Sequence, residues 1–260
     1  MDTITSLKNE RVKLVYGLQN RVRTRRKERK IALEGTRVIR DAVERGQKPL
    51  FTLYEPGKAD YNLIAEFQTR GVDLLPVSTE VMAHISDTNS PPGIITVFRL
   101  PVPPLPRKPR HVLILDNLRD PGNMGGIMRT AAAAGIEVVL LSPGCTDPYN
   151  PKVLRGGMGA HFRVAVVEAN WDEIGGYCEP LNVYLAAGDA HTDYAAVDWT
   201  QPWALVIGSE AQGISSETEA LMGKRVRIPM AAETESLNAG VAAGVILFEA
   251  SRQMRVAAEG

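Results

Sequence analysis

The sequence predicts an α/β protein in which a small α/β domain precedes a larger domain built on a parallel sheet. Short apolar runs alternate with helical patterns along the 260-residue chain. One segment, residues 101–109, contains five prolines and separates the two parts. After that segment the apolar runs are short and most are separated by helical patterns, as in a parallel sheet covered by helices on both faces.

The part before the proline-rich segment alternates helices with strands. Val12, Val15 and Leu18 recur every three residues, which places them on one face of a helix. Thr36 is expected to cap a further helix that Gly46 ends. The remaining elements expected here are strands at 50–54, 72–77 and 94–98 and helices at 61–70 and 78–85.

The same alternation continues after the proline-rich segment on a larger scale. We expect residues 1–100 and 111–260 to form separate domains, with 101–110 as an interdomain linker, because proline removes donors and stiffens the chain. The elements expected in the second domain are strands at 112–115, 138–141, 183–186, 205–207 and 226–228 and helices at 124–134, 151–158 and 237–253.

Composition excludes several classes of protein. With 44% hydrophobic and 23% charged residues, the chain is neither disordered nor fibrous. No apolar run reaches the length of a membrane span, and the polar N-terminus does not resemble a signal peptide. Two cysteines, Cys145 and Cys178, predict free thiols in a reducing, cytoplasmic environment, and the scattered histidines predict no metal site.

Positive charge is concentrated in the first part of the chain. Residues 1–110 hold 20 basic and 12 acidic residues, whereas residues 111–260 hold 10 and 18. Such a patch suits a polyphosphate partner, RNA or DNA, although a solvated helix face with a flexible loop is the alternative. The residues expected to hold a nucleic-acid backbone are Arg21, Arg23, Arg25, Arg26, Lys27 and Lys30. The aromatic side chains of Tyr16, Phe51 and Tyr54 are predicted to be core residues rather than base-stacking residues.

Three predicted strand ends continue into glycine-rich or polar loops, and ligands of parallel sheets bind at such ends. After 112–115, Asn123 is positioned to cap a helix that carries Arg129. After 205–207 the sequence has Gly208, Glu210 and Gly213, and after 226–228 it reaches Ser236-Leu237-Asn238. The structural alternative is that the polar residues are only caps or surface groups and that the glycines only allow positive φ. Neither a G-x-G-x-x-G nor a G-x-x-x-x-G-K-[ST] motif is present, which disfavours dinucleotide and nucleotide-hydrolysis functions.

Together the three segments resemble the signature motifs of the SpoU (TrmH-like) RNA ribose 2′-O-methyltransferases of the SPOUT superfamily. The matching patterns are N-x-G-x-x-x-R-T-A from Asn123, G-x-E-x-x-G from Gly208 and I-P-M…S-L-N from Ile228. The resemblance covers about residues 111–255, and residues 1–100, with Leu33-Glu34-Gly35 before a helix, resemble the substrate-binding domain often fused in front. One departure is Ala211, where many relatives have glycine.

The resemblance implies a C-terminal domain with a deep trefoil knot, bound S-adenosylmethionine and a homodimer that packs through this domain. The residues it implies for cofactor binding are Gly208, Gly213, Ile228 and Leu237, together with Ala186, Gly188 and Met230. The catalytic residues it implies are Asn123, Arg129, Glu210, Ser236 and Asn238.

The chemistry of methyl transfer to a ribose hydroxyl suggests a role for each implied catalytic residue. Arginine stays protonated in proteins, so we expect Arg129 to bind phosphate or stabilise the developing alkoxide rather than act as a base. Asn123, Ser236 and Asn238 are expected to orient the ribose, and Glu210 is expected to position Arg129 or the loop around it. The helix at 237–253, with Gly240 and Gly244 on one side, is either a dimer element or simple core packing.

The two-domain layout resembles enzymes that modify ribosomal RNA, so we expect methylation of 23S rRNA rather than tRNA. A tRNA methyltransferase, and a non-catalytic RNA-binding or ribosome assembly factor of the same fold, are the alternatives. A plain dinucleotide enzyme lacks its fingerprint.

Overall fold

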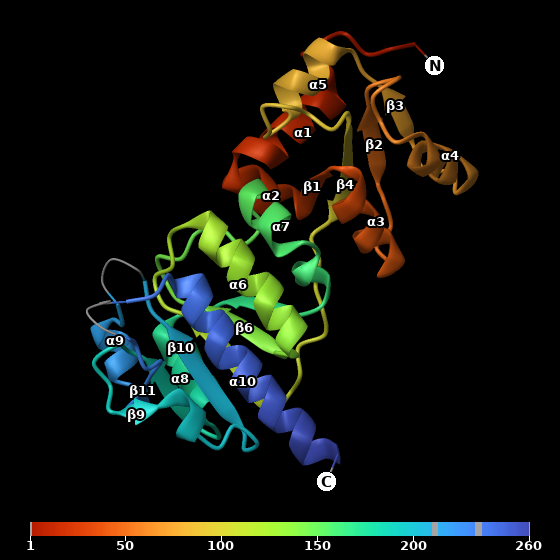
Figure 1. Cartoon of the computed structure of the whole chain (residues 1–260). Helices are drawn as coiled ribbons and strands as arrows, with labels where there is room; N and C mark the ends of the chain where they lie inside the picture. The colour runs from red at the N-terminus through yellow and green to blue at the C-terminus, as the bar shows by residue number, and fades with distance from the viewer. Residues whose placement is uncertain (1, 210–212, 232–235, 260) are drawn as a thin grey trace. The chain divides into compact units, whose positions relative to one another are not determined.

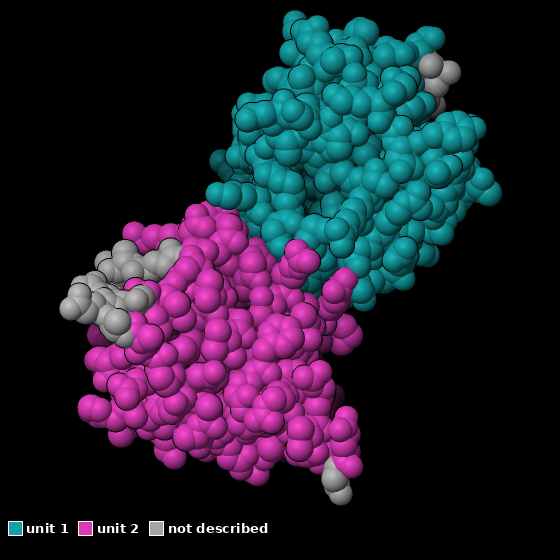
Figure 2. Space-filling view, in the orientation of Figure 1, with its two compact units in different colours: residues 1–101, 149–162 teal, residues 102–148, 163–260 magenta. Residues whose placement is uncertain are grey.

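A computed structural model of the chain describes residues 2–209, 213–231 and 236–259 (Figure 1). The chain forms two compact units, shown in different colours in Figure 2. Unit 1 contains residues 1–101 and 149–162, and unit 2 contains residues 102–148 and 163–260. Unit 1 thus includes the segment 149–162, which lies within the range 111–260 expected for the second domain.

The described part of unit 1 contains a mixed four-stranded sheet. The strand order is β1-β4-β2-β3, in which β4 is antiparallel to both neighbours and β3 is parallel to β2. The strands are β1 (Lys30–Glu34), β4 (Ile94–Arg99), β2 (Phe51–Tyr54) and β3 (Leu74–Pro76). Strand β1 was not predicted, because its apolar run Ile31–Leu33 is only three residues long and follows the basic segment directly.

Helices cover both faces of this sheet. On one side α1 and α5 bury Val12, Val15 and Met82 with the inward side chains of the strands. On the other side α3, α4 and α7 bury Ile39 and Leu154. The helical elements of unit 1 are α1 (Glu10–Asn20), α2 (Val22–Glu28), α3 (Thr36–Glu44), α4 (Tyr61–Thr69), α5 (Thr79–Ile85), α7 (Pro151–Gly157) and the 3₁₀ helix η1 (Ala160–Phe162).

The beginning of α3 differs from the prediction. Gly35 is the N-cap residue, with φ of 98° and no side-chain cap hydrogen bond, and Thr36 is already the first helical residue. A positive φ at the cap favours glycine, so the chain turns sharply from β1 into α3 at this position.

Unit 2 contains a sheet that is parallel throughout its described strands, as predicted. The order is β7-β6-β5-β10-β8-β11-β9. The strands are β5 (His111–Leu115), β6 (Val138–Leu141), β7 (Ala165–Glu168), β8 (Asn182–Ala186), β9 (Thr192–Asp193), β10 (Trp203–Ile207) and β11 (Lys224–Arg227). The trefoil knot that the resemblance implies stays a prediction.

Helices pack on this sheet, and two of them lie side by side over it (Figure 1). These are α6 (Pro121–Ala134) and α10 (Ala239–Glu259), whereas α8 (Trp171–Cys178) buries Ile174 and Cys178 against the strands. The short elements are η2 (Tyr194–Ala196) and α9 (Ser216–Glu219). Helix α8 was not predicted, although its capping box between Asn170 and Glu173 is a recognisable signal.

The two glycines of α10 face α6. A Cβ placed on Gly240 would lie 3.9 Å from Ile127, and one on Gly244 would lie 3.9 Å from Thr130. This small-residue side of α10 therefore serves packing within the chain, which was the alternative to a dimer contact.

Within the described part of the chain, no helix is both long enough and apolar enough to cross a membrane.

Candidate functional site

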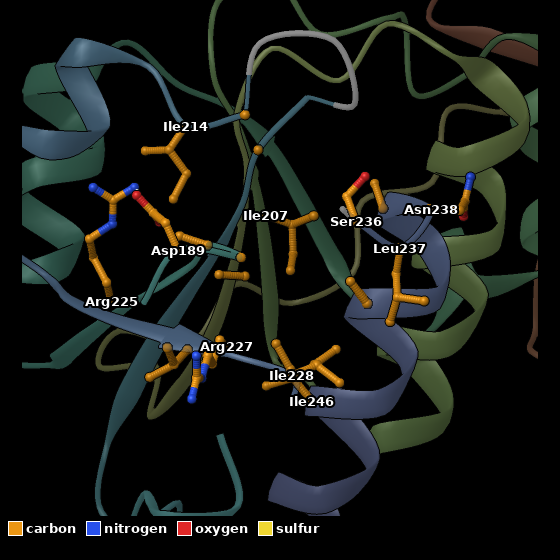
Figure 3. Close-up of a pocket in the computed structure, with 18 of the residues that line it drawn as sticks. Asp189, Ile207, Ile214, Arg225, Arg227, Ile228, Ser236, Leu237, Asn238 and Ile246 are labelled. Carbon is orange, nitrogen blue, oxygen red and sulfur yellow. The ribbon is translucent and has the colours of Figure 1, made fainter. Parts of the chain in front are cut away.

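A pocket of about 600 Å³ lies at the carboxyl ends of β8, β10 and β11, beside the start of α10 (Figure 3). Its position agrees with the general location of ligand sites in parallel sheets. All seven residues predicted to bind the cofactor line it, together with Ser236 and Asn238 of the predicted catalytic set. Those seven are Ala186, Gly188, Gly208, Gly213, Ile228, Met230 and Leu237.

One wall of the pocket is apolar. Ile207 at the end of β10, Ile228 after β11 and Ile246 on α10 point into it from three separate elements (Figure 3). Backbone from the glycine-containing strand ends lies around this wall, including Gly188 and Gly208. An apolar surface bordered by backbone donors and acceptors, in a cavity of this size, fits an adenosyl group.

In the segment after β10, the backbone requires glycine at two positions, Gly208 and Gly213, for different reasons. A Cβ on Gly208 would lie 2.2 Å from the carbonyl oxygen of Gly213, so only glycine permits this close approach of two backbone segments. Gly213 has φ of 66°, where side chains are strained. Ser209 and Gly213 exchange two backbone hydrogen bonds, of 2.9 and 2.8 Å, which hold these two residues together. The predicted catalytic residue Glu210 lies outside the described residues.

Asp116 anchors the segment that follows Gly213. It is 1% exposed, directly after β5, and its Oδ2 accepts hydrogen bonds from the Ser215 backbone N–H at 2.7 Å and the Thr218 hydroxyl at 2.8 Å. Its own N–H donates to the Ile207 carbonyl at 2.9 Å. Asp116 therefore ties β5, the end of β10 and the start of α9 together. Asp116 is not among the predicted site residues, although an aspartate directly after a buried strand is a usable signal.

The first and third motifs meet through a pair of asparagines. The Nδ2 of Asn238 donates to the Oδ1 of Asn123 at 3.0 Å, across 115 positions in the sequence. The Oδ1 of Asn238 also accepts from the backbone N–H groups of Gly240 and Val241, so this side chain caps the start of α10. One residue therefore fixes the helix and joins the two motifs.

The predicted capping role of Asn123 is wrong. Asp120 is the N-cap residue of α6, and its side chain accepts from the Asn123 backbone N–H at 2.7 Å. Pro121 follows as the first helical residue, a position that tolerates its missing N–H. Asn123 lies inside the first turn, where its side chain reaches Asn238.

Arg129 does not line the pocket with Ser236 and Asn238. Its side chain is exposed on α6, and it is not among the described residues that line the pocket. The structure thus brings Asn123, Ser236 and Asn238 to the pocket region of one chain, whereas Arg129 lies elsewhere on that chain's surface.

Two arginines that the sequence analysis did not single out also line the pocket. Arg225 pairs with Asp189 at 3.0 Å and with Glu219 at 3.3 Å. Arg227, two residues later on the same face of β11, is exposed (Figure 3). The two arginines give this side of the pocket a positive charge, which suits an anionic group such as a carboxylate or a phosphate.

The cysteines do not offer a nucleophile. Burial raises the pKa of Cys178 to about 11. Burial also raises the pKa of Cys145, whose Sγ donates to the Leu115 carbonyl. Both thiols stay protonated at neutral pH, so covalent catalysis by cysteine is not favoured. Among the described residues no cluster of three histidine, cysteine or acidic side chains could hold a metal ion.

The basic segment of unit 1 is mostly exposed, with one exception. Arg21, Arg23, Arg26 and Lys27 are exposed on and beside α2, and Lys30 pairs with Glu28 at 3.1 Å. Arg25, in contrast, is 4% exposed, and its guanidinium donates to the Leu18 carbonyl at 2.6 Å. Arg25 therefore holds α2 against the end of α1, and its prediction as a nucleic-acid contact is wrong.

Comparison with known proteins gives consistent matches over both units. The model of the SpoU rRNA Methylase family matches residues 110–248, and that of the MRM3-like substrate binding domain matches residues 9–96. The mouse (Mus musculus) protein "rRNA methyltransferase 3, mitochondrial" is 35% identical, over 90% of this chain and 70% of its own length.

A bacterial enzyme and a solved structure match over nearly the whole chain. The 23S rRNA (guanosine(2553)-2′-O)-methyltransferase RlmP of Bacillus subtilis is 29% identical, over 95% of this chain and 98% of its own. The AdoMet-bound rRNA methyltransferase from Sinorhizobium meliloti superposes with a TM-score of 0.83 at 30% identity, over 97% of this chain and 98% of that one.

Proposed function

The chain belongs to the SpoU rRNA methylase family, and from this premise we propose that it methylates a ribose 2′-hydroxyl of RNA with S-adenosylmethionine as methyl donor. We further propose 23S rRNA as the substrate. The observation that carries this proposal is the pocket at the strand ends, next to which the Asn123–Asn238 pair joins two motifs. A non-catalytic RNA-binding factor would have no need of this combination.

The pocket fits the methyl donor, which when bound supplies an electrophilic methyl group on a sulfonium. In our proposal Ile207, Ile228 and Ile246 hold the adenosyl group, and the backbone at Gly188 and Gly208 hydrogen-bonds its polar edge. Gly213, Ala186, Met230 and Leu237 complete the enclosure. The exposed guanidinium of Arg227 is positioned to donate hydrogen bonds to the carboxylate of the methyl donor or to an RNA phosphate.

Ser236, Asn238 and Asn123 would orient the ribose beside this pocket. Ser236 and Asn238 line it, and the hydrogen bond between the two asparagines keeps the amide of Asn123 at the same edge. Alignment of the attacking oxygen is the main task in such a transfer, because a positioned hydroxyl reacts far faster than a freely diffusing one.

Arg129 would complete the site from a second copy of the chain. It does not line the pocket of its own chain, whereas α10, beside α6, exposes the apolar side chains of Val241, Phe248 and Val256. These three residues recur at intervals of seven and eight, which places them on one side of the helix. A homodimer through this surface would cover them, and we propose that it carries Arg129 into the partner's pocket.

The exposed cations of unit 1 would hold the RNA backbone. We propose this role for Arg21, Arg23, Arg26 and Lys27, and for Lys30 once its contact with Glu28 is exchanged for phosphate. Neutralising Arg23 and Arg26 would weaken RNA binding and flatten its salt dependence. The cytoplasmic location stays a prediction, since some relatives are named as mitochondrial proteins and others are bacterial.

The test is methyl transfer from radiolabelled S-adenosylmethionine to 23S rRNA and to tRNA, with ribose methylation mapped on total RNA from cells with and without the protein. We expect one 23S rRNA position to lose its methyl group without the protein. The Arg129→Ala variant is expected to lower kcat by about 10²-fold, since it removes one group that stabilises the transition state. Arg110→Ala, which removes an exposed arginine of the linker, is the matched control. Near-normal transfer by Arg129→Ala would contradict its assigned role, and identical RNA methylation maps would contradict the proposed function.

A further inference from the structure

Unit 1 carries an exposed pair of stacked rings. Tyr16 on α1 and His84 in the last turn of α5 lie parallel, with ring centroids 4.5 Å apart and planes 7° from parallel. His84 is exposed although Tyr16 covers one face of its imidazole. Its solvent-accessible area must therefore lie on the other face and the edges. Tyr16 is half-buried, so its prediction as a core residue holds for only part of the side chain.

Positive charge lies on the Tyr16 side of this pair. The Arg21 guanidinium lies 5.9 Å from the centroid of the Tyr16 ring, and α2 continues from there with the exposed Arg23 and Arg26. A Cβ on Gly17 would come within 3.0 Å of Thr24, so α2 packs directly on α1 at the residue that follows Tyr16.

The acidic residues within α1, α2 and α5 are Glu10, Glu28 and Glu80. On α1, Glu10 pairs with Lys13 at 3.3 Å, and at the end of α2, Glu28 pairs with Lys30 at 3.1 Å. On α5, Glu80 lies one turn before His84 and would repel a phosphate at that end. A base, which is uncharged, can approach His84 where a phosphate cannot.

The stack is not needed to join α1 to α5. These helices already share a buried core in which Val12 and Val15 pack with Val81, Met82 and Ile85. An exposed ring pair on top of such a core adds little stability, whereas an exposed aromatic face beside cations is what an unpaired nucleotide requires.

We propose that the outer face of His84, backed by Tyr16, stacks on an unpaired base of the RNA while Arg21, Arg23 and Arg26 hold the adjoining phosphates. This inference rests on the proposed function in taking RNA as the substrate. It adds that unit 1 selects single-stranded loops over duplex, because the bases of a duplex are stacked on each other and cannot reach the ring.

The experiment compares binding of the full-length protein to two RNA probes, a short hairpin with 2-aminopurine in its unpaired loop and a fully paired duplex. The variants are His84→Ala, His84→Phe, which keeps a stacking ring, and His191→Ala, which removes an exposed histidine of unit 2 as the matched control. We expect His84→Ala to weaken hairpin binding roughly tenfold, without altering its salt dependence, and to abolish quenching of the 2-aminopurine. Duplex binding should stay unchanged, and the other two variants should behave as the parent protein.

Three results would overturn the inference. His84→Ala could bind the hairpin as tightly as the parent protein does, or it could lose equal affinity for hairpin and duplex. In the third result His84→Ala has a lowered Tm, and His84→Phe does not restore hairpin binding. The last result would identify the stack as merely structural. Methyl transfer to 23S rRNA is measured in parallel with the parent protein. Active transfer together with any of these results refutes only the stacking site, whereas absent transfer refutes the proposed function and leaves the binding comparison valid.

Discussion

Replacing Gly208 by alanine tests how the pocket is built. The new Cβ would lie 2.2 Å from the oxygen and 2.4 Å from the carbon of the Gly213 carbonyl, both well inside the ordinary contact distance of 3.4 Å. Both neighbours are backbone atoms, so no side chain can rotate away. The loop must open, and opening it disrupts the two hydrogen bonds between Ser209 and Gly213.

The loss of these two hydrogen bonds sets the expected free-energy cost of Gly208→Ala. Each backbone hydrogen bond contributes about 1 kcal/mol net, so their loss costs about 2 kcal/mol. Because the loop lines the pocket, we expect this cost to fall on S-adenosylmethionine binding as a roughly 30-fold higher Kd. Isothermal titration calorimetry with Gly208→Ala measures the affinity directly, and thermal unfolding shows whether the variant is folded.

A matched glycine substitution separates steric conflict from the general effect of adding a methyl group. Gly175 lies in α8, where a Cβ would meet no atom within 4 Å. Gly175→Ala should leave the Kd unchanged and raise stability by up to about 1 kcal/mol, since alanine is favoured over glycine inside a helix. If Gly208→Ala is folded and binds the cofactor within about threefold of the parent protein, the reasoning from the Gly208–Gly213 contact is refuted.

Three further predictions concern the dimer, the core and the C-terminal helix. Mixing Arg129→Ala with Gly208→Ala should restore methyl transfer in hybrid dimers, because one pocket then has both an intact Gly208 and the partner's arginine. If verified hybrids show no recovery, Arg129 acts in the site of its own chain. Asp116→Ala should lower the free energy of unfolding by about 3 kcal/mol, measured by urea denaturation, because two hydrogen bonds to a buried carboxylate are lost; a loss below about 1 kcal/mol would contradict its anchoring role. Hydrogen bonds, chiefly from Arg252, lower the pKa of Glu249 from 4.5 to about 2, so its stabilising effect is present above pH 4.5 and is lost as the pH falls through 2. Glu249→Gln should therefore be less stable than the parent at pH 7, and the difference in Tm should shrink toward pH 2; a constant difference would contradict this account.

Local patterns were sufficient for most elements and for the position of the pocket. Apolar runs of four or five residues, such as those ending at Leu115 and Ile207, locate buried strands because burial on both faces requires continuous apolar sequence. The three motifs follow predicted strands, and loops after parallel strands share one edge of the sheet, so the motifs were expected to lie close together. The seven residues that line this pocket as predicted were implied by the family resemblance and not by local patterns.

Local patterns did not predict which side chains contact each other when the contact depends on how the elements pack. Arg25 has the same charge and local spacing as Arg23 and Arg26, and only the packing of α2 on α1 buries it against the Leu18 carbonyl. Asn123 has the chemistry of a cap, but Asp120 takes that role and leaves the Asn123 side chain to Asn238. The segment 149–162 lies between two strands of unit 2 yet packs in unit 1.

The order of residues was therefore enough to specify the α/β class, most strands and helices, and which loops meet at the pocket, because each depends on hydrophobic period and turn chemistry within about ten neighbouring positions. Folding in three dimensions decided which cation is buried, why Gly208 must lack a side chain, which asparagine caps a helix, and that Arg129 lies away from the pocket of its own chain. Those outcomes depend on contacts between positions far apart in the chain, such as Asn123 with Asn238 and Asp116 with Thr218, and no local pattern records them.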